Sequence, residues 1–158
     1  MPAVVTRPCA FGFAFFALSS AASAQQTTPR PVRWSLSVPV ANVAELRARI
    51  VPGWHLYSLT QPPGGPRPTL IEIIGESPFR LAGPIGRAAP DTIPDAVFGI
   101  MSEVYDDSVT FHLPLAIRSP PLRGDSRLAV AVTFQACMRR LCLRPRTDTV
   151  DVAVRSRR

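Results

Sequence analysis

The sequence predicts an all-β protein folded as an antiparallel β-sandwich. Apolar and polar residues alternate with a period of two in several separate segments, as they do in strands that have one buried and one exposed face. No segment shows helical periodicity, and the 18 prolines of the chain argue against long helices. Turn-forming residues separate the segments, and about seven short strands arranged in this way within one domain are typical of a sandwich.

The predicted strands follow one another along the chain. Alternation is clearest over residues 34–40, 44–50, 109–117, 128–135 and 150–154. Two more strands are predicted over residues 69–74 and 79–82, where the composition favours β-structure. Residues 83–102 are rich in Pro, Gly and Ala and have no clear period. The sequence therefore predicts a long loop there, and long loops in compact domains are often functional.

The N-terminal residues have the pattern of a secretory signal peptide over residues 1–24. Arg7 supplies a positive charge, residues 9–18 are apolar, and Ala22-Ser23-Ala24 forms an A-x-A cleavage site. The apolar run is shorter than the roughly 20 residues that a permanent membrane anchor needs. We therefore expect an exported protein without a membrane anchor, with a flexible leader over residues 25–32 and a single domain over residues 33–158.

The charge balance is basic, with a formal net charge of +7, and all 18 basic residues are arginine. A basic surface can attract nucleic acid, anionic lipid or an acidic protein face. Most of the arginines are dispersed along predicted strands and loops, and no basic helix or aromatic stacking motif accompanies them. We therefore expect no nucleic-acid partner.

Two cysteines, Cys137 and Cys142, are the only ones left once the predicted signal peptide is removed. Cysteines at this spacing would diverge around a helix and would point to opposite faces of a straight strand. A bridge between them therefore requires a turn over residues 138–141. Closing so short a loop stabilises a protein by about 2 kcal/mol in the chain-entropy model, which is little for a domain of this size.

Three functions remain open for this cysteine pair. It can be a structural disulfide in a non-catalytic binding module, a redox-active pair, or part of a copper or zinc site. Arg139 and Arg140 lie between the cysteines, and nearby guanidinium charge can lower a thiol pKa, although a solvated turn explains them equally well. A metal site would need His55 or His112 as a further ligand, and no ligand spacing supports either, so we expect no bound metal.

Several separated motifs occur in a defined order along the chain. They are Gly53-Trp54-His55-Leu56-Tyr57, then Phe98-Gly99, Ser102-Glu103-Val104-Tyr105 and Phe134-Gln135-Ala136-Cys137, the last followed by Cys142 and Pro145. In this order they resemble the N-terminal periplasmic domain of the thiol:disulfide interchange protein DsbD, over about residues 33–154. The resemblance implies an immunoglobulin-like fold and a cysteine pair that exchanges disulfides with other proteins in the periplasm, as a thiol-disulfide oxidoreductase component.

The resemblance also implies roles for individual residues. Cys137 and Cys142 would be the catalytic pair and would form a disulfide with each other. Cys137 would form the mixed disulfide with a partner, and Cys142 would resolve it. Phe98 matches an aromatic residue in a loop that caps the pair, and Tyr57 matches an aromatic residue that packs near the cysteines.

The chain departs from the family pattern at two places. Arg144 stands where the family often has the first of two prolines, so that only Pro145 remains. Ala96 and Val97 stand where acidic residues usually precede the cap aromatic, which leaves Asp95 as the nearest acid. By resemblance, the partners would be periplasmic thioredoxin-like or other thiol-disulfide proteins, with a separate membrane electron transporter as a possible donor. We expect a monomer that needs no cofactor.

Overall fold

A computed structural model describes residues 28–40, 42–118 and 125–155, so the predicted signal peptide lies outside the described residues. The described residues form twelve strands, all paired antiparallel, which confirms the predicted all-β class. The strands are β1 (Val32–Val40), β2 (Val43–Ile50), β3 (His55–Tyr57), β4 (Leu70–Ile74), β5 (Phe79–Leu81), β6 (Asp91–Asp95), β7 (Ile100–Tyr105), β8 (Ser108–Ile117), β9 (Asp125–Phe134), β10 (Ala136–Met138), β11 (Leu141–Cys142) and β12 (Arg146–Arg155). Within these residues, no helix has the length and apolar character needed to cross a membrane.

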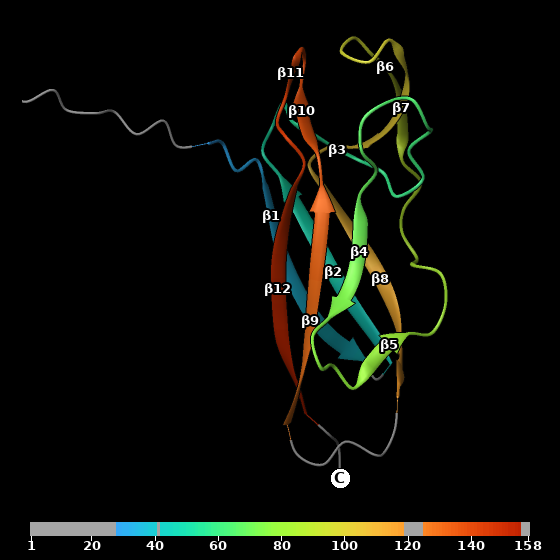
Figure 1. Cartoon of the computed structure of the whole chain (residues 1–158), viewed down its shortest axis with the longest axis vertical. Helices are drawn as coiled ribbons and strands as arrows, with labels where there is room; N and C mark the ends of the chain where they lie inside the picture. The colour runs from blue at the N-terminus through green and yellow to red at the C-terminus, as the bar shows by residue number, and fades with distance from the viewer. Residues whose placement is uncertain (1–27, 41, 119–124, 156–158) are drawn as a thin grey trace, which may run out of the picture.

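Two sheets form the sandwich, and a third extends it at one end. The sheet β1-β2-β8-β5 packs against the sheet β12-β9-β4, as Figure 1 shows. The third sheet has the order β11-β10-β3-β7-β6. It grows directly out of the sandwich, because β10 follows β9 after one residue and β7 leads into β8 through a short turn. The hairpins β10–β11 and β6–β7 therefore lie at the same end of the molecule.

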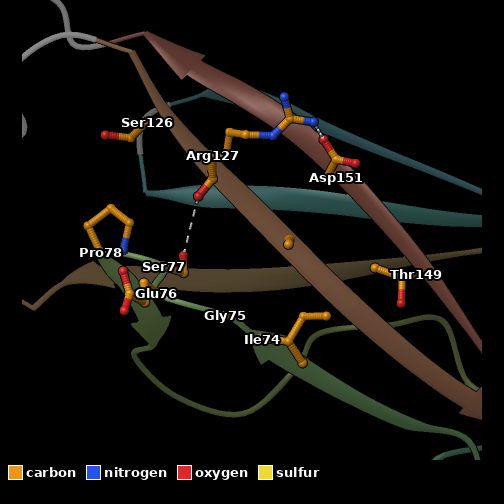
Figure 2. Close-up of a pocket in the computed structure, with 10 residues that line it drawn as sticks. Ile74, Gly75, Glu76, Ser77, Pro78, Ser126, Arg127, Thr149 and Asp151 are labelled. Carbon is orange, nitrogen blue, oxygen red and sulfur yellow. Dashed lines mark hydrogen bonds and ion pairs between the residues drawn. The ribbon is translucent and has the colours of Figure 1, made fainter.

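At the opposite end, a shallow pocket lies between the β4–β5 connection and strands β9 and β12 (Figure 2). Arg127 on β9 forms an ion pair with Asp151 on β12. The backbone carbonyl of Arg127 also accepts a hydrogen bond from the Ser77 hydroxyl at 3.5 Å, which ties the β4–β5 connection to the sheet. None of the described residues that line this pocket is a cysteine or a histidine.

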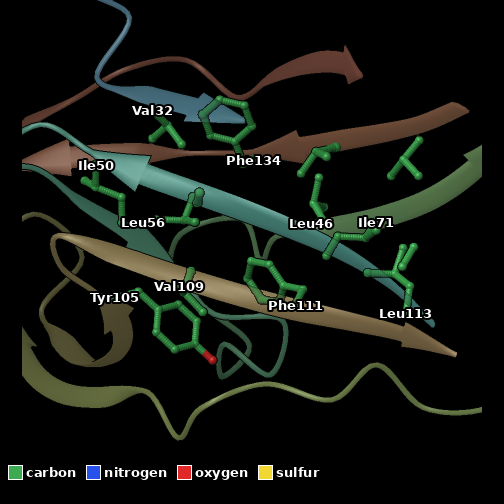
Figure 3. Packing of buried hydrophobic residues seen from close by; sticks show 14 of the residues in the cluster. Val32, Leu46, Ile50, Leu56, Ile71, Tyr105, Val109, Phe111, Leu113 and Phe134 are labelled. Atoms are coloured by element: carbon green, nitrogen blue, oxygen red, sulfur yellow. The ribbon is translucent and has the colours of Figure 1, made fainter. Parts of the chain in front are cut away.

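The main core lies between the two sandwich sheets and is filled by the predicted alternating residues. Figure 3 shows Leu46 from β2, Phe111 from β8 and Phe134 from β9 directed into this space. Trp34 packs edge-on against Phe134, with ring centroids 5.4 Å apart, and Phe111 packs edge-on against Tyr105 at 5.9 Å. Such aromatic contacts add stability beyond the area that they bury. The apolar residues that alternate in the sequence thus lie on the strand faces that are buried between the two sheets.

The predicted long loop over residues 83–102 is wrong in its second half, where β6 and the start of β7 form a hairpin. β6 escaped prediction because it is an edge strand with mostly exposed side chains, so its sequence carries no buried alternation. It also contains Pro94, which cannot donate a backbone hydrogen bond and is tolerated in strands chiefly at edges. The short strands β3, β10 and β11 were likewise not predicted, because two or three residues are too few to show a period.

The packing of Phe111 generates a first prediction. Phe111 is fully buried and contacts both Trp34 and Tyr105, so Phe111→Ala should leave a large cavity between the sheets. We expect a loss of about 3–5 kcal/mol in the free energy of unfolding, measured by urea denaturation with the disulfide intact. Ile117 on the same strand is 45% exposed, and Ile117→Ala should cost less than about 0.5 kcal/mol. Equal losses from the two substitutions would contradict the described core.

Candidate functional site

One face of the third sheet gathers the candidate site residues. Side chains alternate between the two faces of a strand, and directly paired residues on neighbouring strands share a face. Cys137 pairs with Cys142 on one side and with His55 on the other, so these three residues lie in a row across β11, β10 and β3. Tyr57 lies two positions beyond His55 on β3 and pairs with Val104 on β7, on the same face.

The other face of this sheet belongs to the main core. Leu56, Tyr105 and Ala136 alternate with the site residues and are at most 5% exposed among the residues between the sandwich sheets. The site face instead forms a small separate cluster of Tyr57, Val104 and Cys137, all at most 1% exposed. The third sheet therefore anchors the site residues through one face and presents them on the other.

The cysteines are joined by a disulfide across the β10–β11 hairpin, with their Cα atoms 4.1 Å apart. Arg139 and Arg140 form the two-residue turn of this hairpin and are exposed. The turn predicted from the cysteine spacing is therefore confirmed. The two sulfurs differ in their surroundings, because Cys137 is 1% exposed whereas Cys142, near the open edge, is only partly buried.

Tyr57 connects the disulfide to a carboxylate. Its hydroxyl donates a hydrogen bond to Oδ2 of Asp95 at 2.6 Å and lies 3.9 Å from Sγ of Cys142. Burial, together with the hydrogen bond to Asp95, raises the pKa of Tyr57 far above its ordinary value, so the phenol stays protonated. Nε2 of His55 lies 3.3 Å from the same hydroxyl. Since the single phenolic proton is directed to Asp95, we assign His55 as the donor in this contact.

His55 is a neutral neighbour of the disulfide at neutral pH. Partial burial lowers the pKa of its ring, and the opposing charges of Asp106 and Asp95 do not overcome this effect. Its ring packs edge-on against Tyr57, with centroids 5.2 Å apart. His55 thus supports Tyr57 both by packing and by donating a hydrogen bond.

Asp95 organises the β6–β7 turn. Its Oδ1 accepts hydrogen bonds from the backbone N–H groups of Val97 at 2.9 Å and Phe98 at 3.2 Å, and its carbonyl accepts one from Gly99. Burial alone would raise the pKa of Asp95, but these hydrogen bonds and the one from Tyr57 lower it below its ordinary value. The turn places the half-buried Phe98 ring edge-on to Tyr57, with centroids 6.4 Å apart.

Glu103 and Gln135, two polar residues of the sequence motifs, hold neighbouring segments together around the site. Glu103 accepts hydrogen bonds at 2.5 Å from the hydroxyls of both Ser58 and Thr60, and these bonds lower its pKa. They fasten the segment after β3 onto β7. The side chain of Gln135 accepts a hydrogen bond from the N–H of Arg67 and donates one to the carbonyl of Leu143, so it closes the base of the cysteine hairpin.

The structure brings together four of the residues predicted for the site: Cys137, Cys142, Tyr57 and Phe98. Arg139 and Arg140 lie at the exposed hairpin tip, and their predicted influence on the thiols stays a prediction. Sequence reasoning undervalued His55, which it considered only as a metal ligand, and Asp95. Among the described residues, no three His, Cys, Asp or Glu side chains are grouped closely enough to hold a metal ion.

Comparison with known proteins identifies the family. Residues 23–154 match the family model described as thiol:disulfide interchange protein DsbD, N-terminal. None of the curated protein sequences compared with the chain is significantly similar to it.

Two solved structures are similar in fold. One is the N-terminal domain of DsbD from Neisseria meningitidis in the reduced form, with 16% sequence identity and a TM-score of 0.56. The other is the complex between the DsbD N-terminal and PilB N-terminal domains from the same organism, with 16% identity and a TM-score of 0.55. Each alignment covers 80% of this chain and 87% of the solved one. The fold is therefore an immunoglobulin-like sandwich, and the chain belongs to the family of N-terminal domains of the thiol:disulfide interchange protein DsbD.

Proposed function

We propose that this domain exchanges disulfides with partner proteins through the bond between Cys137 and Cys142. The observation that carries the proposal is the position of this bond, which closes a hairpin at the end of the sandwich and has one partly exposed sulfur. As a staple it would contribute only about 2 kcal/mol. The bond joins neighbouring strands of one hairpin and does not cross between the two sandwich sheets, so exchange accounts for it better than stabilisation does.

We also propose that the exchange takes place in the periplasm with thioredoxin-like or other thiol-disulfide proteins. The predicted signal peptide over residues 1–24 supports export. The solved complex of a DsbD N-terminal domain with a PilB N-terminal domain supports a protein partner. A separate membrane electron transporter as the donor is part of the same proposal. The exchange itself transfers electrons between sulfur atoms and needs no cofactor.

The proposed reaction moves two electrons and two protons in two steps. A partner thiolate attacks Sγ of Cys142, the Cys142–Cys137 bond breaks, and Cys137 leaves as a thiolate that takes up a proton. The second thiol of the partner then loses its proton and attacks the partner sulfur of the mixed disulfide. The partner is oxidised to its disulfide, and Cys142 is released and protonated. The same steps in reverse pass the electrons to an oxidised acceptor.

The attack is assigned to Cys142 because it is the more exposed of the two cysteines. Cys137 is 1% exposed and lies on β10 between β3 and β11, whereas Cys142 is only partly buried. Cys142 lies on the outer strand of the sheet. This proposal reverses the roles expected from the resemblance, in which Cys137 forms the mixed disulfide.

Tyr57 and Asp95 would restrain the reduced thiols. A thiolate at Cys142 is favoured by a hydrogen-bond donor and disfavoured by a nearby negative charge. The Tyr57 proton is already donated to Asp95, and Asp95 itself is negative. The reduced pair would therefore rest as thiols. Docking that moves the β6–β7 turn, whose Phe98 ring packs against Tyr57 and whose amides are held by Asp95, would release this restraint.

Equilibrium with glutathione redox buffers tests the proposed function. We expect a reduction potential above about −300 mV, because structural disulfides of secreted proteins typically lie below that value. We also expect the reduced domain to remain folded in circular dichroism, since it loses only about 2 kcal/mol. A potential well below this limit, with slow exchange, would assign the bond to stabilisation of a binding module instead.

A trapping experiment tests the assignment of Cys142. Cys137→Ala leaves Cys142 without its resolving partner, so it should accumulate a mixed disulfide with the oxidised N-terminal domain of Neisseria meningitidis PilB. Cys142→Ala should accumulate about ten-fold less on non-reducing gels, because Cys137 is buried. More product from Cys142→Ala would restore the role for Cys137 implied by the resemblance.

Alkylation of the reduced thiols by iodoacetamide tests the cap. Phe98→Ala removes an edge-on contact with Tyr57, and such contacts are worth roughly 0.5–1.5 kcal/mol. The alkylation rate should therefore rise by about two- to ten-fold. Val97→Ala, a substitution of the neighbouring residue that is 42% exposed, should leave the rate unchanged. The cap assignment fails if Phe98→Ala behaves like Val97→Ala.

A further inference from the structure

The turn between the two cysteines is built from an unusual residue pair. Arg139 and Arg140 form the whole connection between β10 and β11, because Met138 pairs directly with Leu141. Arg139 has a φ of 46°, in the left-handed region. Glycine normally takes such a position in a two-residue hairpin turn, since a side chain is disfavoured there. An arginine held in this conformation points to a role beyond forming the turn.

The two arginines carry charge to the edge of the disulfide. Arg139 is two residues from Cys137, Arg140 is two residues from Cys142, and both are exposed. Neither takes part in the three ion pairs found among the described residues. The carboxylate of Asp95 also lies in the site, but that residue is 7% exposed and accepts hydrogen bonds from Tyr57 and the β6–β7 turn. The exposed Asp106 acts on His55, at the junction of β7 and β8, and not at the tip of the cysteine hairpin. The charge that the hairpin tip itself offers to an approaching protein is therefore positive.

Exposed apolar side chains also lie on the two hairpins that carry the site. Leu141 is 52% exposed, but it alternates with Cys142 and therefore faces the other side of the sheet. Met101 on β7 is 53% exposed and likewise lies on the opposite face from Val104. Val97 in the β6–β7 turn is 42% exposed. The feature that distinguishes the hairpin tip is therefore its charge.

We propose that Arg139 and Arg140 select partner proteins that carry carboxylates beside their reactive cysteine or disulfide. The inference rests on the proposed function, since docking at Cys142 is what brings the partner surface to the hairpin tip. Opposite charges on two approaching surfaces speed the encounter of the proteins and favour the docked complex, whereas like charges slow the encounter and disfavour the complex. The disulfide supplies the chemistry, and the arginine turn decides which proteins reach it.

Three peptide disulfides test the proposal. They are dimers of equal length, in which the cysteine is flanked by two glutamates, two glutamines or two lysines. The rate of exchange with the reduced mature domain is measured for each at about 0.01 M salt, where charges act over about 30 Å. We expect the glutamate peptide to react about five-fold faster, and the lysine peptide about five-fold slower, than the glutamine peptide. At about 1 M salt the three rates should converge.

Variants locate the source of the preference. Arg139→Gly with Arg140→Gln removes both charges and suits the left-handed backbone, so the hairpin should stay folded. Its three rates should become equal at low salt. Arg80→Gln, on the exposed surface of β5 at the far end of the sandwich, should keep the full preference. Comparing peptides within one variant cancels any change in thiol pKa, which would alter all three rates together.

The outcomes separate this inference from the proposed function. Equal rates in the unsubstituted protein, or a preference that survives the double substitution, would overturn the role of the arginines while leaving exchange intact. Failure of all three peptides to react would count against the proposed function itself. Binding to phosphatidylglycerol vesicles that depends on both arginines, without any preference among the peptides, would assign the tip to a lipid surface and would also overturn the inference.

Discussion

The alternation of side chains across the third sheet is the constraint on which the site depends. Because neighbouring residues of a strand face opposite sides, Leu56, Ala136 and Tyr105 enter the main core while Tyr57, Cys137 and Val104 face the site. Tyr57, Cys137 and Val104 are thus each held by a covalent neighbour that is buried in the sandwich. The proposed exchange would therefore take place on the face of the sheet that the main core does not use.

The hydrogen bond between Tyr57 and Asp95 links the site face of the third sheet to the β6–β7 turn. It joins residues 38 positions apart and fastens the β6–β7 turn to β3. A buried hydrogen bond to a charged group contributes about 1.5–3 kcal/mol, and losing either partner leaves the other unsatisfied. The same Asp95 carboxylate holds the turn amides and accepts the Tyr57 proton, so turn position and sulfur environment are coupled. Movement of this turn would therefore change the hydrogen bonding of Tyr57 and with it the electrostatics around Cys142.

The sequence allowed prediction of the long strands, because their buried faces repeat every second residue in segments such as β2 and β8. The cysteine spacing predicted a turn, and the motif order predicted the family. The edge strand β6 was missed because its side chains are mostly exposed, so burial leaves no trace in its sequence. The roles of His55 and Asp95 were not predicted for another reason. The contact of Asp95 with Tyr57 depends on the β6–β7 hairpin folding beside β3, and no local pattern encodes that approach. His55 lies only two residues from Tyr57, but its position beside Cys137 depends on the pairing of β3 with β10.

The charged residues of the site fall into two groups that act at different stages. Asp95 is buried, so the surrounding protein screens its charge weakly, and in the proposed exchange this charge acts on the nearby Cys142 sulfur. Arg139 and Arg140 are exposed, so they lose little hydration and their field reaches an approaching surface before contact. If the arginines were buried, their charge would no longer act on an approaching surface, and removing them from water would cost a large desolvation free energy. A tight exposed turn between the cysteines therefore lets partner choice vary with the arginines while the chemistry stays with the enclosed residues.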